Sequence, residues 1–240
     1  DLEDQEWLQE SLSSISARRV SISKNVRGER AKWQRMAADN VNLTLEQRLA
    51  ATSDQVERMK SLSKALGMDS IIDWIECFDV SHTQGEATIA SCVVFDQNGP
   101  RKSDYRKFKI RDTQGGDDYA AMREVIERRY SRLQREAENL PDVLLIDGGK
   151  GQLGKVKEVF EELQIEEVKI LGIAKGVTRK PGLETIFLGE PGNVINLPRG
   201  SKALRHLQYI RDEAHRFAIE AHRRSRAKTR NRSSLEGIPG

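Results

Sequence analysis

The chain contains the stretch Val143-Leu144-Leu145-Ile146-Asp147-Gly148-Gly149, in which four apolar residues run directly into a carboxylate and two glycines. A short continuous apolar run of this kind is typical of a strand covered on both faces of a sheet. Ligand sites in open α/β sheets gather outside the carboxyl ends of such strands. The stretch therefore predicts a buried central strand that delivers Asp147 to a candidate site.

The segments around this strand predict a mixed α/β domain. Before it, β-branched and aromatic residues predict an antiparallel meander of three strands, at residues 71–80, 86–95 and 103–110. Helical spacing of apolar residues predicts three helices, at residues 117–135, 152–163 and 203–221. A further apolar strand and a hairpin are expected at residues 168–174 and 184–197. Three strands, helix, strand, helix, strand and closing helix is the order of a ribonuclease H-like domain, a mixed sheet flanked by helices.

Composition limits the rest of the chain. Its 240 residues, 37% of them hydrophobic, can form one core of ordinary size plus an extension, which we place at residues 1–70 and expect to be helical. The apolar runs are too short to span a membrane, and the start lacks a secretory signal, so we expect a cytoplasmic protein. Cys77 and Cys92 lack metal-ligand spacing and are expected to be reduced thiols.

Positive charge is concentrated near the C-terminal end, although the net charge is only +3. Basic residues greatly outnumber acidic ones between residues 201 and 232. Such a run is usually a solvated face, but its density also suits contact with a phosphate backbone.

Two further carboxylates are candidates for chemistry. Asp79 lies within an apolar predicted strand, where an unpaired carboxylate would cost several kcal/mol, so it needs either a metal or a hydrogen-bond network. Asp118 lies at the start of a predicted helix, where acidic residues are common for capping reasons alone.

His215 is the fourth candidate and lies on the closing helix, one position from its apolar stripe. Histidines in such places are usually structural, but the nearby Arg211 would favour the neutral ring, which can bind a metal or accept a proton. Together with Asp79, Asp118 and Asp147, it would suit Mg²⁺ or Mn²⁺, which prefer hard ligands and can align a water for attack on a phosphodiester.

A nucleotide-binding domain is an alternative for the glycine-rich turn. The turn Gly148-Gly149-Lys150-Gly151-Gln152 resembles a phosphate loop in composition but lacks the GxxxxGK[ST] spacing. A tight strand-to-helix turn explains it better.

Several blocks resemble, in order, the C-terminal endonuclease region of the UvrC family, which serves bacterial nucleotide excision repair. They are Ile75-Glu76-Cys77-Phe78-Asp79-Val80-Ser81-His82, Ala90-Ser91-Cys92-Val93-Val94-Phe95, Gly116-Asp117-Asp118-Tyr119-Ala120-Ala121-Met122, Leu145-Ile146-Asp147-Gly148-Gly149-Lys150-Gly151-Gln152 and Ile210-Arg211-Asp212-Glu213-Ala214-His215-Arg216-Phe217-Ala218. The resemblance implies a ribonuclease H-like endonuclease domain at residues 71–226. It also implies a basic tail with the truncated start of a helix-hairpin-helix domain at residues 227–240.

The resemblance further implies roles for single residues. Asp79, Asp147 and His215 would hold the catalytic Mg²⁺ or Mn²⁺, and Asp118 would be an acidic residue needed for incision. The basic residues proposed to contact the DNA backbone are Lys175, Arg179, Lys180, Arg211, Arg216 and Arg223.

The family resemblance also implies the reaction and the partners. The expected activity is the 5′ incision beside a lesion in damaged double-stranded DNA, since we see no block of the family's N-terminal GIY-YIG nuclease. The expected protein partner is UvrB, with UvrA acting upstream. The alternative is a catalytically silent ribonuclease H-like scaffold that binds DNA or a partner, and metal-dependent cleavage would distinguish the two.

Overall fold

The computed structural model describes residues 4–23, 25–81, 88–110, 117–174, 184–189 and 192–233, with side chains up to residue 220. The chain forms two compact units, residues 1–50 and 51–240. Helix α1 (Gln5–Ser16) lies in the first unit, and helix α2 (Glu29–Ala65) continues from the first unit into the second. No described helix combines the length and the apolar character that crossing a bilayer requires.

Helix α2 runs without a break within the extension that the sequence predicts to be helical. Residues 29–65 contain neither glycine nor proline, so nothing in the backbone interrupts the hydrogen-bond ladder. Gly67, with φ +62°, lies just beyond its end in the left-handed conformation that glycine adopts readily. Met59 and Leu62, in the last turns of α2, are fully buried in the second unit. The extension assigned to residues 1–70 therefore contributes side chains to the core, and its boundary stays a prediction.

One mixed sheet organises the second unit, and eight strands of the described residues belong to it. Its order is β3-β2-β1-β5-β6-β7-β8, and β4 also pairs with β2. The strands are β1 (Trp74–Ser81), β2 (Ile89–Asp96), β3 (Gly99–Pro100), β4 (Arg106–Lys109), β5 (Val143–Asp147), β6 (Lys169–Ala174), β7 (Thr185–Leu188) and β8 (Val194–Ile195). β1, β5 and β6 run parallel to one another, whereas the other pairings are antiparallel. The predicted buried central strand and hairpin are confirmed, and the three antiparallel strands of the meander are present as β1, β2 and β4, the first beginning at Trp74 and not at residue 71.

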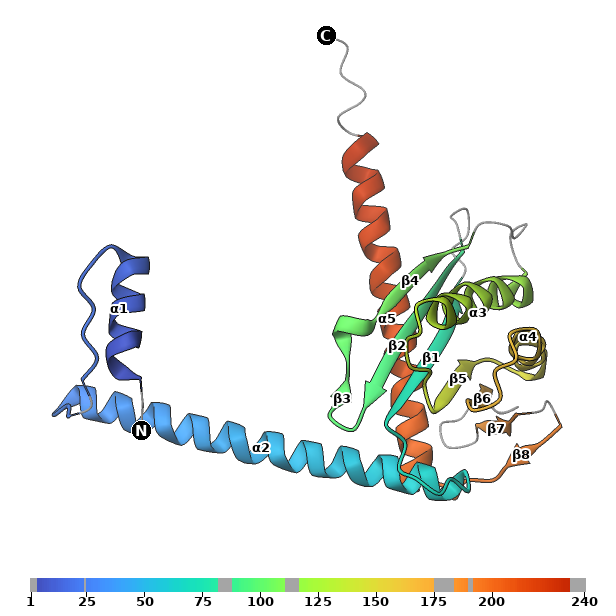
Figure 1. Ribbon diagram of the computed structural model, residues 1–240, viewed down its shortest axis with the longest axis horizontal. Coiled ribbons are helices and arrows are strands. Elements are labelled where there is room, and N and C mark those ends of the chain that lie inside the picture. The colour runs from blue at the N-terminus through green and yellow to red at the C-terminus, as the bar shows by residue number, and fades with distance from the viewer. Residues whose placement is uncertain are drawn as a thin grey trace, which may run out of the picture. The chain divides into compact units, whose positions relative to one another are not determined.

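Helices cover both faces of this sheet (Figure 1). Helices α3 (Asp118–Arg135) and α4 (Lys150–Glu162) contribute to one core cluster, and α5 (Lys202–Ser233) contributes to the other. Alternate residues of β1 point to the two clusters: Phe78 faces α3 and α4, whereas Ile75 and Cys77 face α5. This alternation places Asp79 on the α5 face.

The predicted third strand is wrong at its start. Residues Lys102–Asp104 form a 3₁₀ turn, and pairing begins only at Arg106. The side chain of Arg101 forms an ion pair with Asp104 across this turn. Within the turn, the backbone N–H groups of Asp104 and Tyr105 donate to the carbonyls of Arg101 and Lys102 in place of ladder hydrogen bonds.

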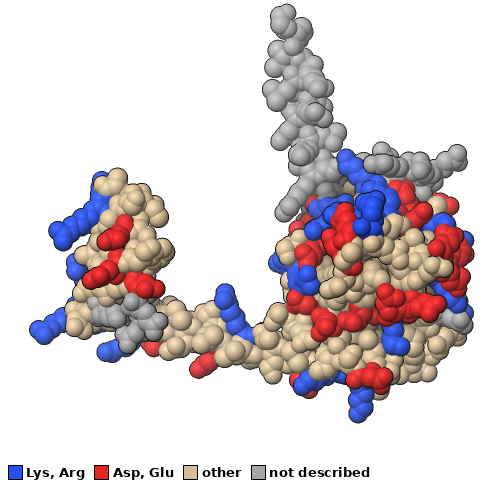
Figure 2. All heavy atoms as spheres, viewed as in Figure 1, with Lys and Arg blue, Asp and Glu red and all other residues tan. Residues whose placement is uncertain are grey.

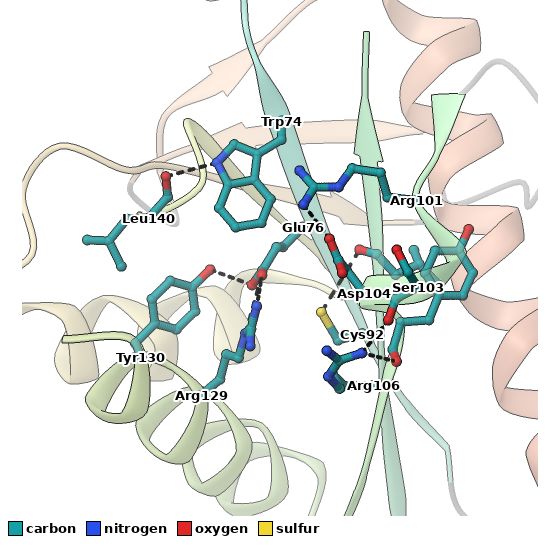
Figure 3. Close-up of polar contacts among 12 residues, drawn as sticks. Trp74, Glu76, Cys92, Arg101, Ser103, Asp104, Arg106, Arg129, Tyr130 and Leu140 are labelled. Atoms are coloured by element: carbon teal, nitrogen blue, oxygen red, sulfur yellow. Dashed lines mark hydrogen bonds and ion pairs between the residues drawn. The ribbon is translucent and has the colours of Figure 1, made fainter. Parts of the chain in front are cut away.

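A buried polar network joins α3 to β1 on the opposite face from α5 (Figure 3). Glu76 is fully buried and accepts hydrogen bonds from Arg129 Nη2 at 2.7 Å and from the Tyr130 hydroxyl at 3.1 Å. A buried carboxylate is tolerated when a cation and a second donor satisfy it, as here. The network fixes the rotational setting of α3, whose first residue is Asp118.

Candidate metal centre

Two neighbouring parallel strands bring the first two carboxylates together. β1 and β5 pair in register up to Phe78 and Ile146, so Asp79 and Asp147 each follow the last pair by one residue. Both point to the α5 face, because they continue the alternation of Cys77 and Leu145. The tight turn after Asp147 begins α4 at once, and Gly148 donates its N–H to the carbonyl of Ile173 at 3.1 Å.

Helix α5 supplies the imidazole, and a buried hydroxyl holds the helix in place. Ser91 pairs with Asp79 across β1 and β2, and its Oγ donates to the carbonyl of Ala214 at 3.2 Å. His215 is the next residue, and its Nδ1 lies 3.4 Å from Asp79 Oδ2. This hydrogen bond attaches α5 to β2 one residue before His215, opposite Asp79 on the neighbouring strand β1.

The ligand atoms of Asp79, Asp147 and His215 lie within 4.8 Å of one another. Asp79 is 8% exposed at its side chain and accepts a hydrogen bond from Ser81 Oγ at 3.1 Å, whereas the His215 side chain is 57% exposed. Two carboxylate oxygens and one imidazole nitrogen form a donor set that suits Mg²⁺ or Mn²⁺ and leaves coordination positions for water. The site is thus buried on the sheet side and open on the helix side.

A buried thiol lies beneath the two carboxylates. Burial raises the pKa of Cys77 well above its usual range, and the charges of Asp147 and Asp79 raise it further. The raised pKa favours the protonated thiol in the metal-free protein.

Asp118 lies outside the group of three. It is the first residue of α3, and Asp117 caps the helix by accepting from the N–H groups of Tyr119 and Ala120. The Tyr119 ring lies where a Cβ on Gly151 would be, 2.3 Å from that position at its nearest atom, so α3 and α4 begin side by side. Since α4 follows Asp147 directly, Asp118 lies near the end of the sheet at which β5 ends with Asp147. The role of Asp118 stays a prediction.

The glycine-rich turn is filled by the protein itself. A Cβ on Gly148 would lie 1.6 Å from the Oε1 of Gln152, because the Gln152 amide folds back over the turn. This arrangement fits the tight strand-to-helix turn expected from the sequence, and nothing in it favours the nucleotide-binding alternative.

The predicted backbone-contacting residues differ in how well they can be placed. Arg211 and Arg216 lie on α5, one turn before His215 and one residue after it. Arg216 is 59% exposed and pairs with the buried Glu213. Lys175, Arg179 and Lys180 lie outside the described residues, as does the side chain of Arg223.

Sequence reasoning missed Glu184. Ile186 faces α5, so Glu184, two residues earlier, faces it too, at the same end of the sheet as Asp147. Its side chain is 4% exposed and accepts from Gln208 Nε2 at 2.8 Å and Arg211 Nη1 at 3.2 Å. Burial opposes ionisation of Glu184, but the hydrogen bonds from Gln208, its own backbone and Arg211 outweigh it and lower its pKa. Alternation with Ile186 was the signal that could have found it.

The surface of the second unit has no single charge sign on the face drawn in Figure 2, where acidic and basic side chains are interspersed. A mixed sheet with helices on both faces and a site of two strand carboxylates and one helix imidazole defines the class as a ribonuclease H-like domain with a candidate metal centre. The chain belongs to the UvrC RNAse H endonuclease domain family, whose model matches residues 63–219. A second model, described as the UvrC Ribonuclease H-like domain, matches residues 1–48.

Full-length relatives agree with this membership. The chain is 48% identical over 239 residues to the UvrABC system protein C of Hahella chejuensis and 50% identical over 238 residues to that of Alkalilimnicola ehrlichii. All or nearly all of this chain aligns, and it spans 39% of the length of each relative. Among solved structures, human ENDOV aligns over 74% of this chain and 99% of its own, with 13% identity and a TM-score of 0.36, a similarity too low to carry a functional argument.

Proposed function

We propose that this chain is a divalent-metal-dependent DNA endonuclease that hydrolyses a phosphodiester bond in nucleotide excision repair. The observation that carries the proposal is the convergence of Asp79, Asp147 and His215 within 4.8 Å, in a chain of an endonuclease domain family. Within that reaction we assign it the 5′ incision, beside a lesion in double-stranded DNA, with UvrB as the partner of the full-length protein. A cytoplasmic location accompanies this role.

We assign a separate role to each residue of the candidate metal centre. Asp79 and Asp147 would hold Mg²⁺ or Mn²⁺, with His215 as the third ligand. When bound, the cation supplies positive charge to the phosphate and lowers the pKa of a coordinated water. His215 has the most exposed side chain of the three and would complete the ligand set from the open side of the centre.

The remaining residues would serve the substrate. Asp118, at the start of α3, is proposed as an acidic residue needed for incision. Arg211 and Arg216 flank His215 on α5 and would bind backbone phosphates, which fixes the position of DNA without reading its sequence. Lys175, Arg179, Lys180 and Arg223 complete the proposed backbone contacts.

Nicking of supercoiled plasmid tests this function directly. We expect the wild-type chain to nick in Mn²⁺ or Mg²⁺ and to be inactive in EDTA, and Asp79→Asn and His215→Ala to lose at least about a hundredfold in rate, the scale of losing a pre-organised electrostatic group. Asp54→Asn is the matched control, because it removes a carboxylate that is 48% exposed and paired with Arg58 on α2.

The possible outcomes separate enzyme from scaffold. Nicking that survives in Asp79→Asn would mean that the assigned site is wrong. A wild-type chain that binds Mn²⁺ and DNA without nicking under any condition would instead support a catalytically silent scaffold.

A further inference from the structure

The guanidinium of Arg211 is held on two sides by carboxylates of very different exposure. Its Nη1 donates to Glu184 Oε1 at 3.2 Å, and its Nε and Nη2 both donate to Asp212 Oδ1, at 3.0 and 2.7 Å. The side chain of Glu184 is 4% exposed, whereas that of Asp212 is 66% exposed. The two contacts therefore differ in how easily water or another anion can replace them.

Arg211 lies at the margin of the metal centre. It precedes His215 by one turn on α5, a spacing that puts side chains on the same helix face. Burial opposes the charge of Arg211, but the hydrogen bond and charge of Asp212, the hydrogen bond to Glu184 and the charge of Asp147 outweigh it and raise its pKa. The guanidinium is thus a permanent cation next to the candidate catalytic carboxylates.

The buried contact is the fixed one. Gln208 occupies the second oxygen of Glu184, so both oxygens of this carboxylate are bound to α5. Breaking a buried ion pair leaves a charge without compensation and is strongly unfavourable. Glu184 therefore sets the direction in which the remaining edge of Arg211 points.

The exposed contact is the exchangeable one. A solvated ion pair between neighbouring residues contributes little to stability, so its loss costs little. The Nε–Nη2 edge that Asp212 occupies is an edge that arginine uses to bind phosphate oxygens. Asp212 thus occupies the position of an anionic ligand.

We propose that Arg211 binds a DNA backbone phosphate through its Nε–Nη2 edge, that Asp212 occupies this edge in the free protein and is displaced on binding, and that Glu184 is the positioning residue that aims the guanidinium. The proposal rests on the proposed function and deepens it. It adds to the proposed phosphate contact of Arg211 a residue that competes with the phosphate, Asp212, and a residue that orients the guanidinium, Glu184.

Binding of a fluorescein-labelled DNA duplex in EDTA, followed by anisotropy over a range of salt concentrations, tests the proposal without requiring catalysis. Asp212→Asn should bind about two- to fivefold more tightly at low salt, the scale of an exposed ion pair. Arg211→Gln should bind more weakly and lower the slope of log K against log salt by about one, the value of one phosphate contact. Glu184→Gln should weaken binding in the same direction as Arg211→Gln.

A double-variant cycle makes the test specific. If Asp212 competes with phosphate for Arg211, Asp212→Asn should have no effect in the Arg211→Gln background. Glu158→Gln is the control for net charge, because it removes one negative charge from an exposed site whose partners are Lys155 and Arg123. Arg211→Lys keeps the positive charge but loses the paired N–H donors of the guanidinium, so it should bind DNA more weakly than the wild type.

Three results would overturn the proposal. They are unchanged DNA affinity in Asp212→Asn, an equal increase in affinity in Glu158→Gln, or the same increase from Asp212→Asn in the Arg211→Gln background. A wild-type chain that nicks plasmid but gives any of these results would contradict the displacement and leave the nuclease function standing. A wild-type chain that binds no DNA would contradict both. Thermal melts of Glu184→Gln show whether its weaker binding arises from unfolding, and a folded variant with wild-type affinity would remove Glu184 as the positioning residue.

Discussion

Asp79 and Asp147 are two like charges at adjacent strand ends, and Asp79 is largely withdrawn from water. Like charges at close range destabilise the folded protein unless a cation offsets them. Asp79→Asn should therefore raise the melting temperature of the metal-free protein. The same change should remove the stabilisation by Mn²⁺, which in the wild type is about 2.7 kcal/mol at a hundredfold excess over Kd, or about 5–10 °C for a domain of this size.

Melting curves with and without Mn²⁺ measure both halves of this expectation. Asp54→Asn, on the surface of α2, should respond to Mn²⁺ as the wild type does. A lower melting temperature of metal-free Asp79→Asn, together with a full response to Mn²⁺, would show that Asp79 is a structural carboxylate.

His206 is a titratable group that the proposed function does not use. It is fully buried, and neither ring nitrogen has a hydrogen-bond partner among the described residues. Burial, reinforced by the charge of Arg58, lowers its pKa from 6.5 to about 4. The folded protein therefore holds a neutral imidazole, against which the ring of Phe95 packs edge-on.

This shift predicts a pH dependence of stability. Above about pH 6.5 the ring is neutral in both states and contributes no slope, whereas between pH 6.5 and about 4 only the unfolded chain takes up the proton, so stability falls as pH falls. The full effect is about 3 kcal/mol. Denaturant unfolding should show that the free energy of unfolding falls less in His206→Leu than in the wild type across this pH window, by that amount. An identical fall in both proteins would contradict the assigned shift.

Among the helices and strands, the geometry of the candidate metal centre depends on how α5 is attached to the sheet. Ser91 donates to the carbonyl of Ala214 from β2, and Tyr105 donates to Glu213 at 3.1 Å from the segment before β4. Burial and the charge of Glu213 raise the pKa of Tyr105, so its hydroxyl remains a donor. Both contacts fall within two residues of His215.

Ser91→Ala should therefore cost about 1 kcal/mol of stability, the value of one buried hydrogen bond, and also weaken Mn²⁺ binding, because His215 loses its anchor. Ser63→Ala is the control for metal affinity, since Ser63 is also buried and its hydroxyl donates to Met59 at 2.9 Å and accepts from the Ile72 N–H at 2.9 Å, away from the centre. Isothermal titration with Mn²⁺ distinguishes them. Equal metal affinity in both variants would show that Ser91 only stabilises the fold.

The elements were predictable where one local pattern dominates. The apolar run before Asp147 indicated a central strand, and β5 lies between β1 and β6 as expected. The 3₁₀ turn at Lys102–Asp104 was not predictable, because the local backbone hydrogen bonds that replace strand pairing there leave no pattern in the sequence. Similarly, the contacts that hold α5 join residues more than a hundred positions apart, such as Ser91 and Ala214, and leave no local signal.

At the scale of the whole molecule, the sequence indicated which residues could form a site and the structure shows which of them meet. Asp79, Asp147 and His215 converge, although 68 residues separate each from the next, because the strand order β2-β1-β5 and the crossing of α5 bring them together. Asp118 lies apart from this group, and Glu184 joins its surroundings without having been predicted. The chain spans 39% of the length of the Hahella chejuensis and Alkalilimnicola ehrlichii relatives.

Anomalous diffraction from crystals of the chain grown with Mn²⁺ would show whether Asp79, Asp147 and His215 bind one catalytic divalent cation. We expect an anomalous peak coordinated by these three side chains, which disappears in crystals of Asp79→Asn. An empty centre at saturating Mn²⁺, or a peak that persists unchanged in Asp79→Asn, would mean that the three residues do not form the metal site.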